Sequence, residues 1–101
     1  MTKKILLVCA GGFSTSMLVE RMKEAAKAKG VDAVIDACGE GSLESYLPAD
    51  IVMLGPQMGH QEDSVKGKVG SDVPVTVIEM MDYGMMDGEK VLNTAFKLME
   101  K

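Results

Sequence analysis

Residues 6–18, LLVCAGGFSTSML, join an apolar run to a helical pattern through a cysteine, two glycines and three hydroxyl residues. A short apolar run of this kind is typical of a strand buried on both faces, and we expect one over residues 4–8. From residue 14 or 15 to residue 29 the pattern is helical, because apolar residues recur every three or four positions until a glycine follows. The segment therefore predicts a strand that leads directly into a helix.

Strand-like and helix-like segments alternate along the rest of the chain. The expected strands are residues 31–37, 50–54 and part of 73–80, and the expected helices are residues 42–47, 58–69 and a last one from near Asp87. Residues 82–88, DYGMMDG, have the composition of a loop. The buried face expected for the first helix consists of Leu18, Met22, Ala25, Ala26 and Lys29.

This alternation predicts an α/β fold, because strands separated by helices form parallel βαβ units. The strands lack polar alternation, as expected when helices cover both faces of the sheet. We predict one three-layer domain over residues 1–101, with a four-stranded parallel sheet in the order 2-1-3-4. That order places the first strand inside the sheet, next to two neighbours.

Composition excludes several classes of protein. The net charge of −4 argues against general nucleic-acid binding, which needs a basic surface. No apolar run is long enough to cross a bilayer, and the short N-terminal one is expected to be a strand, not a signal peptide, so we expect a cytoplasmic protein without membrane insertion. With two cysteines and one histidine, the sequence predicts no disulfide scaffold, metal site or cofactor.

Cys9 follows the first strand, at the edge where open parallel sheets bind their ligands. Glycines let the backbone of the next loop curl, so that successive N–H groups point at one spot, and the helix N-terminus adds partial positive charge. The expected anion-binding residues are Ala10, Gly11, Gly12, Phe13, Ser14, Thr15 and Ser16. The same field favours thiolate over thiol, which would make Cys9 a nucleophile that carries a phosphoryl group. The alternative is a buried structural cysteine at a strand end.

Other phosphate-binding loops do not fit this segment. A nucleotide P-loop needs a GxxxxGK[ST] motif, and a dinucleotide-binding loop needs GxGxxG directly after the strand. A cysteine phosphatase of the low-molecular-weight type has an arginine at the position that Thr15 occupies, and the first arginine after Cys9 is Arg21. Without that guanidinium, the loop is suited to hold a phosphoryl group more than to hydrolyse it.

Three segments resemble the IIB component of the lactose/cellobiose/diacetylchitobiose family of the bacterial sugar phosphotransferase system. They are residues 3–23, KKILLVCAGGFSTSMLVERMK, residues 49–59, ADIVMLGPQMG, and residues 75–92, VTVIEMMDYGMMDGEKVL. The resemblance implies one EIIB domain with a fold similar to low-molecular-weight tyrosine phosphatases. It also implies a phosphotransferase that takes phosphate from a histidine of a IIA subunit onto Cys9. The phosphocysteine then passes it to a sugar on the membrane IIC subunit, a β-linked disaccharide such as cellobiose, lactose or chitobiose.

Gln57, Tyr83 and Asp87 are expected to border the site, because each follows a strand of the sheet. Gln57 is equally suited to a turn after Pro56, and Asp87 to a helix N-cap. Of the remaining polar groups, His60 is expected to be solvated and Cys38 to lie in a loop. Four methionines close together in the sequence suggest that some of them face a partner: Met80, Met81, Met85 and Met86.

Two rival functions are consistent with the residues. The first is a small cysteine-dependent phosphatase, which would turn over an aryl phosphate through Cys9. The second is a regulatory module of the same fold that binds an anion in the loop without reacting with it.

Overall fold

A computed structural model describes residues 3–9, 13–47, 49–70 and 73–99 of the 101-residue chain. Its centre is a four-stranded sheet in the order β2-β1-β3-β4, in which every neighbouring pair is parallel. The strands are β1 (Lys3–Cys9), β2 (Ala33–Gly39), β3 (Ile51–Leu54) and β4 (Val75–Val77). The predicted strand order is thus confirmed, and β1 lies inside the sheet.

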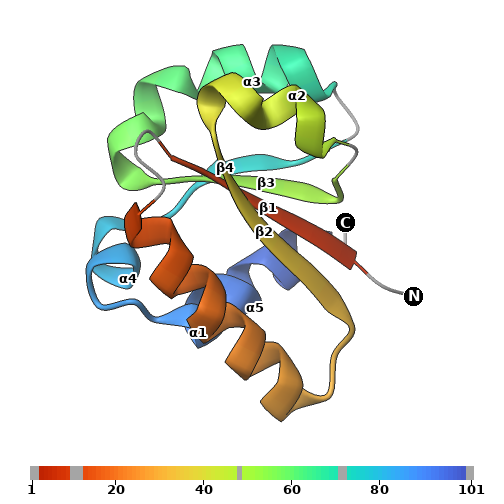
Figure 1. Ribbon diagram of the computed structural model, residues 1–101, viewed down its shortest axis with the longest axis vertical. Coiled ribbons are helices and arrows are strands. Elements are labelled where there is room, and N and C mark those ends of the chain that lie inside the picture. Colours follow the sequence, from red (N-terminus) through yellow and green to blue (C-terminus); the bar gives the residue numbers. More distant parts are fainter. Residues whose placement is uncertain (1–2, 10–12, 48, 71–72, 100–101) are drawn as a thin grey trace.

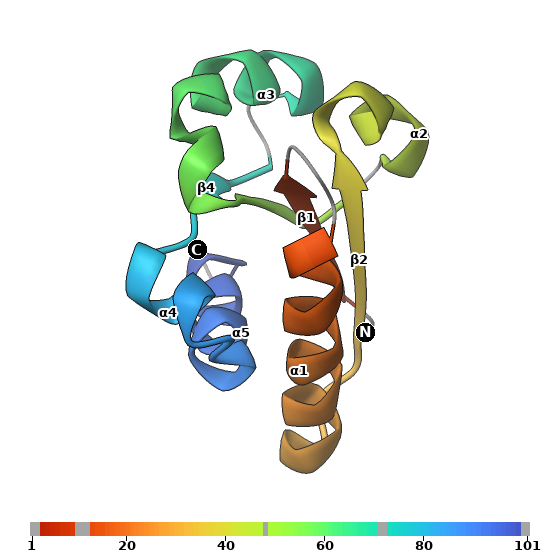
Figure 2. The ribbon, with the colours of Figure 1, turned by 60° about the vertical axis from the view of Figure 1, so that its left-hand side comes forward.

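Helices cover both faces of the sheet, as Figure 1 shows. On one face lie α1 (Phe13–Lys29), α4 (Met80–Gly84) and α5 (Gly88–Met99). On the other lie α2 (Leu43–Tyr46), α3 (Glu62–Val69) and two 3-10 helices, η1 (Glu40–Ser42) and η2 (Pro56–Gln61). Figure 2, turned by 60°, shows the same separation of the two helical layers.

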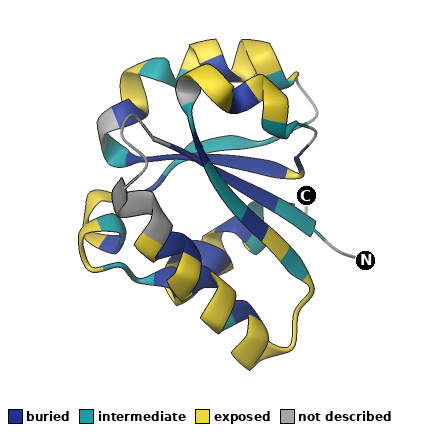
Figure 3. Cartoon of the chain, viewed as in Figure 1, coloured by how far each residue is buried: buried dark blue, intermediate teal, exposed yellow. Residues whose placement is uncertain are grey.

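The central strand β1 supplies side chains to two separate hydrophobic cores. Ile5 and Leu7 are buried in the core shared with α1 and α5, whereas Leu6 and Val8 are buried in the core under α2 and α3. Successive side chains of a strand point to opposite faces, so one apolar run can fill both cores. Figure 3 shows the result as a buried sheet between helices whose outer surfaces are exposed.

The α1–α5 contact depends on a glycine at the first position of α5. A Cβ atom at Gly88 would lie 2.6 Å from the Cβ of Arg21 and 2.6 Å from the backbone nitrogen of Met22. Only hydrogen fits there, so Gly88 allows the two backbones to approach closely. α5 then buries Val91, Leu92 and Ala95 against the core.

Several element boundaries differ from the sequence-based expectations. The second strand runs over residues 33–39 in place of 31–37, because its pairing with β1 continues until Gly39 lies opposite Cys9. Residues 58–69 are not one helix, since η2 precedes α3. The expected loop 82–88 includes the end of α4. Lys29 is exposed and pairs with Glu89, with 3.5 Å between Nζ and Oε2, so the expected stripe on α1 ends one turn earlier.

Candidate functional site

The carboxyl ends of three neighbouring strands lie at one level along an edge of the sheet. The backbone N–H of Gly55 donates to the carbonyl of Val8 across 2.9 Å, and that of Ile78 donates to the carbonyl of Leu54 across 2.8 Å. These bonds extend the β1–β3–β4 ladder beyond the last strand residues of β3 and β4. The segments that follow β1, β3 and β4 therefore leave the sheet side by side, which is the arrangement of ligand sites in open α/β sheets.

Cys9 is the last residue of β1, so the structure places the predicted nucleophile at this edge. Residues 10–12 lie outside the described part of the chain, as do the side chains of Cys9, Gln57 and residues 13–16. In backbone terms, Phe13, Ser14, Thr15 and Ser16 form the first turn of α1. Cys9 is thus separated by only three residues from the start of a 17-residue helix.

The N-terminal end of α1 is favourable for an anion. Backbone N–H groups of a first helical turn lack intrahelical partners and carry the positive end of the helix dipole. The first turn of α1 contains no acidic residue that would compensate this charge. An anion on the segment after β1 would therefore meet donors and a favourable field.

Gln57 is the second residue of η2, directly after β3 and its following glycine. Gly55 is buried, and η2 begins with Pro56 at a position where a proline costs no helical hydrogen bond. The backbone of Gln57 is therefore beside the carboxyl edge, as expected. The structure also bears out a turn at this position, since the N–H of Met58 donates to the carbonyl of Gly55 across 2.8 Å.

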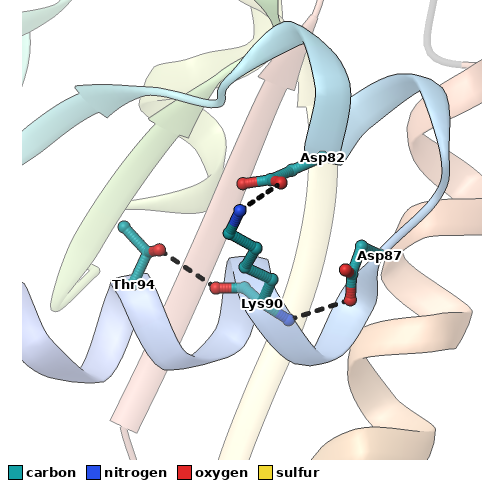
Figure 4. Close-up of polar contacts among 4 residues, drawn as sticks. All are labelled: Asp82, Asp87, Lys90 and Thr94. Atoms are coloured by element: carbon teal, nitrogen blue, oxygen red, sulfur yellow. Dashed lines mark hydrogen bonds and ion pairs between the residues drawn. The ribbon is translucent and has the colours of Figure 1, made fainter.

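Asp87 caps α5. Its Oδ1 accepts a hydrogen bond from the backbone N–H of Lys90 across 3.1 Å, as Figure 4 shows. This is the N-cap role that the sequence allowed for Asp87, and it satisfies one of the donors at the helix start. This hydrogen bond also fixes the Asp87 side chain at the α4–α5 connection.

An ion pair that sequence reasoning missed joins α4 to α5. Among the described residues, Asp82 is the one buried charged residue, and its Oδ1 lies 3.3 Å from Nζ of Lys90 (Figure 4). The hydrogen bond and charge of Asp82 raise the pKa of Lys90 above its ordinary value of 10.5. The pair clamps α4 onto α5. No sequence motif signals it, because the two residues lie on different helices.

Tyr83 lies on α4 and is half-buried against the core that contains α1 and α5. Its hydroxyl oxygen is buried, and within the described ranges no hydrogen-bond partner reaches it. The backbone around it is well bonded, since the Tyr83 N–H donates to the carbonyl of Glu79 across 2.9 Å. Tyr83 therefore follows β4, as expected, but it lies on a helix in place of the expected loop.

The methionines of this segment divide into two groups. Met80, Met81 and Met85 are 76 %, 73 % and 73 % exposed, whereas Met86 is half-buried against the core. Met86 also has a positive φ of 53°, which is uncommon for a residue with a side chain. Three methionines on the segment after β4 are thus exposed.

The structure also places His60 and Cys38, two polar residues outside the predicted site. His60 is exposed and belongs to η2. Cys38 is buried within β2, opposite Val8 of β1, so its expected place in a loop was wrong. The error has the same cause as the shift of β2, which continues through Cys38 to Gly39. Over the described residues, no group of three or more His, Cys, Asp or Glu side chains could hold a metal ion.

A surface groove lies beside the α4–α5 connection. This groove of about 460 Å³ runs between the second half of α1 and the start of α5, and Arg21, Lys29, Asp87 and Glu89 are among its lining residues. Its lining contains both signs of charge, and Gly88 forms part of it.

None of the described helices has the length and apolar character needed to cross a membrane.

The comparison with known proteins gives this arrangement a family. Residues 4–94 match the family described as the PTS system, Lactose/Cellobiose specific IIB subunit. The chain belongs to this family. It is 43 % identical to the oligo-beta-mannoside-specific EIIB component of Bacillus subtilis (strain 168), and the alignment covers 96 % of each chain. It is 41 % identical to the galactose-specific EIIB component of Lactococcus lactis subsp. cremoris (strain MG1363), again over 96 % of each.

A solved structure supports the same assignment. The solution structure of the cellobiose-specific phosphotransferase IIB component from Borrelia burgdorferi is 40 % identical, with a TM-score of 0.81 over 99 % of this chain and 94 % of that one. The parallel α/β fold is therefore the fold of the family. As an EIIB component, the chain is a phosphotransferase subunit of a sugar phosphotransferase system.

Proposed function

We propose that this chain carries a phosphoryl group on Cys9 between a histidine of a IIA subunit and a sugar held by a membrane IIC subunit. The observation that carries the proposal is the position of Cys9 at the end of the central strand, three residues before α1. Family membership supplies the class of reaction, and among the residues of the carboxyl edge a thiolate is the strongest nucleophile.

Both steps would be in-line displacements at phosphorus. In the first, the Cys9 thiolate attacks, the S–P bond forms, and the P–N bond breaks with its electron pair leaving on the donor imidazole. In the second, a sugar hydroxyl oxygen attacks, the S–P bond breaks, and the thiolate is regenerated. The hydroxyl proton passes to a base on the IIC side or to water. The work of the protein is then positioning and charge stabilisation.

The backbone of residues 10–16 is proposed to bind the phosphoryl oxygens. The N-terminal turn of α1 supports this role, because its N–H groups and dipole favour an anion and no acidic residue opposes it. The hydroxyls of Ser14, Thr15 and Ser16 would add donors. Gln57 would border the same site, since its backbone follows β3 at the carboxyl edge.

A carrier is favoured over a phosphatase by the absence of a guanidinium at position 15. Arg21 is the first arginine after Cys9, and it is exposed on α1. The backbone of Arg21 and Met22 lies against Gly88 at the start of α5. That contact places residues 21 and 22 toward α5, away from the first turn of α1. A loop with backbone and hydroxyl donors but no guanidinium would hold the phosphoryl group without strongly stabilising its transfer to water.

The transported sugar is proposed to be a β-linked disaccharide, and the protein to work in the cytoplasm. The relatives named above are specific for oligo-beta-mannoside, galactose and cellobiose, so closely related chains serve different sugars. We infer that most of the sugar selectivity resides in the IIC subunit. The exposed surface of Met80, Met81 and Met85 is proposed to contact a protein partner during transfer.

The test is phosphorylation in a reconstituted system. Purified wild type is incubated with phosphoenolpyruvate, the general phosphotransferase proteins and a IIA subunit of this family, and its intact mass is measured. We expect one added phosphoryl group on wild type and on the matched control Cys38→Ser, but none on Cys9→Ser. An unchanged mass of wild type, or labelling that persists in Cys9→Ser, contradicts the proposal. Steady turnover of an aryl phosphate through Cys9 would favour a phosphatase.

A further inference from the structure

Three methionines on the segment after β4 hold their side chains in solvent. Met80, Met81 and Met85 are 76 %, 73 % and 73 % exposed, so none of them contributes much to the core. Core packing therefore does not explain why three of these residues lie within one short segment. Methionine differs from the other large apolar residues in its sulfur, which is polarisable and can be oxidised reversibly to a sulfoxide. An oxidant dissolved in water has access to all three side chains.

The backbone that carries these side chains is anchored. The N–H of Met85 donates to the carbonyl of Met81 across 3.0 Å, so the two residues are one helical turn apart and share a face of the helix. Between them, the buried carboxylate of Asp82 pairs with Lys90 of α5 (Figure 4). Because Asp82 fastens α4 from its buried side, the exposed side chains can react while the helix stays in place.

The chain also contains buried methionines that serve as internal references. Met22, Met53 and Met58 are 0 %, 1 % and 5 % exposed. An oxidant reaches these residues only when the core opens, and that opening costs free energy. A sulfoxide in the core would also bury a polar group, whereas a sulfoxide on α4 would remain in water. The fold thus separates methionines that can be oxidised in the native state from methionines that cannot.

We propose that Met80, Met81 and Met85 are a site of reversible oxidation, and that their oxidation slows the transfer of phosphate from the IIA subunit. The effect on transfer rests on the proposed function, in which these side chains contact a protein partner. A thioether fits an apolar partner surface, whereas a sulfoxide is polar and would have to lose bound water to make the same contact. Oxidation would therefore weaken the contact without unfolding the carrier.

The oxidant is hydrogen peroxide, and both directions of the reaction balance. The sulfur attacks one peroxide oxygen, the S–O bond forms, the O–O bond breaks, and the second oxygen leaves as water with both protons. Sulfur loses two electrons, and the peroxide gains them. Methionine sulfoxide reductases, one for each epimer of the sulfoxide, reverse the change. In that step a dithiol is oxidised to a disulfide, and the sulfoxide oxygen leaves as water.

The first experiment maps oxidation without any phosphate transfer. The native protein is treated with hydrogen peroxide for increasing times, and peptide mass spectrometry gives the rate of oxidation at each methionine. Met80, Met81 and Met85 should react at least about tenfold faster than Met22 and Met53, which are protected by the core. Met17 on α1 is also exposed and should react as well. Equal rates at exposed and buried positions overturn the site, as does a modification that the reductases do not remove.

The second experiment compares wild type with a variant that carries Met80→Leu, Met81→Leu and Met85→Leu. Leucine keeps an apolar side chain but cannot form a sulfoxide. Each protein is treated with peroxide and then with dithiothreitol, and its rate of phosphate uptake from the phosphorylated IIA subunit is divided by the rate of its own untreated sample. Oxidation of Cys9 would lower this ratio in both proteins, so the difference between the two ratios reports on the three methionines alone.

The expected result is a fall in the wild-type ratio by about tenfold relative to the variant, as for the loss of one well-buried apolar side chain from a contact. The reductases should restore the wild-type rate. Equal ratios for the two proteins overturn the effect on transfer, even if the methionines are oxidised selectively. If untreated wild type accepts no phosphate, the proposed function and the effect on transfer fail together, while the mapping still decides whether these methionines are an oxidation site.

Discussion

Replacement of Gly88 by alanine would test the close contact between α1 and α5. The added Cβ would lie 2.6 Å from both the Cβ of Arg21 and the nitrogen of Met22, where ordinary contacts begin at 3.4 Å. The obstacle is mainly backbone, so relief requires the two helices to separate by about 1 Å or more. Overpacking of this kind costs 1–3 kcal/mol, and a collision with backbone places the expected loss near about 3 kcal/mol. For a domain of this size, the Tm would fall by roughly 10–20 °C.

The assay is urea unfolding followed by circular dichroism, with Gly67→Ala as the matched control. Gly67 lies inside α3, and nothing lies within 4 Å of a Cβ added there. The same substitution should therefore stabilise the protein, by about 0.5–1 kcal/mol, because alanine restricts the unfolded chain and favours helix. Opposite signs are the critical result. If Gly88→Ala is as stable as wild type, then α1 and α5 are not as close at Gly88 as the structure indicates.

Two further substitutions test the α4–α5 connection. Asp87→Ala should lower the free energy of unfolding by about 1 kcal/mol through loss of the N-cap, whereas Asp87→Ser should keep most of the wild-type stability because serine can also cap a helix. Equal losses for the two variants in a denaturant titration would contradict capping. Because Asp82 raises the pKa of Lys90 above 10.5, the stabilisation from their pair is complete below pH 10.5 and is lost as the pH rises through the raised pKa. The Tm difference between wild type and Lys90→Met should therefore be constant at neutral pH and shrink at high pH; a difference that stays the same at high pH would contradict the ion pair.

The sequence was sufficient for the parallel sheet and its order because the relevant signals are local. Each strand is a short apolar run, and β1 can fill two cores only if helices cover both faces. The end of β2 was not predictable in this way. Gly39 has a weak strand preference, and residues 38 and 39 are extended because β1 continues to Cys9 beside them.

The site was predicted in part for similar reasons. Cys9 and the start of α1 follow from a strand, a glycine pair and a helical pattern, all adjacent in the chain. The helix α4 was missed because five residues that end in glycine give no periodic signal. The Asp82–Lys90 pair joins different helices and appears only when both are placed. The burial of the Tyr83 hydroxyl likewise depends on tertiary packing, which no motif encodes.

The order of the strands also bears on how the chain folds as it is synthesised. β1 is made before β3, yet Ile5 pairs with Ile51 of β3, and the apolar stripe of α1 packs against α5, which comes much later in the chain, as well as against the sheet. Pairings between distant parts of a chain form late and leave hydrophobic surface exposed in the meantime. A nascent chain that has reached only α3 therefore lacks the part of the core that α5 contributes around Leu18 and Met22. Chaperone binding and misassembly would compete with folding at that stripe until α5 has emerged.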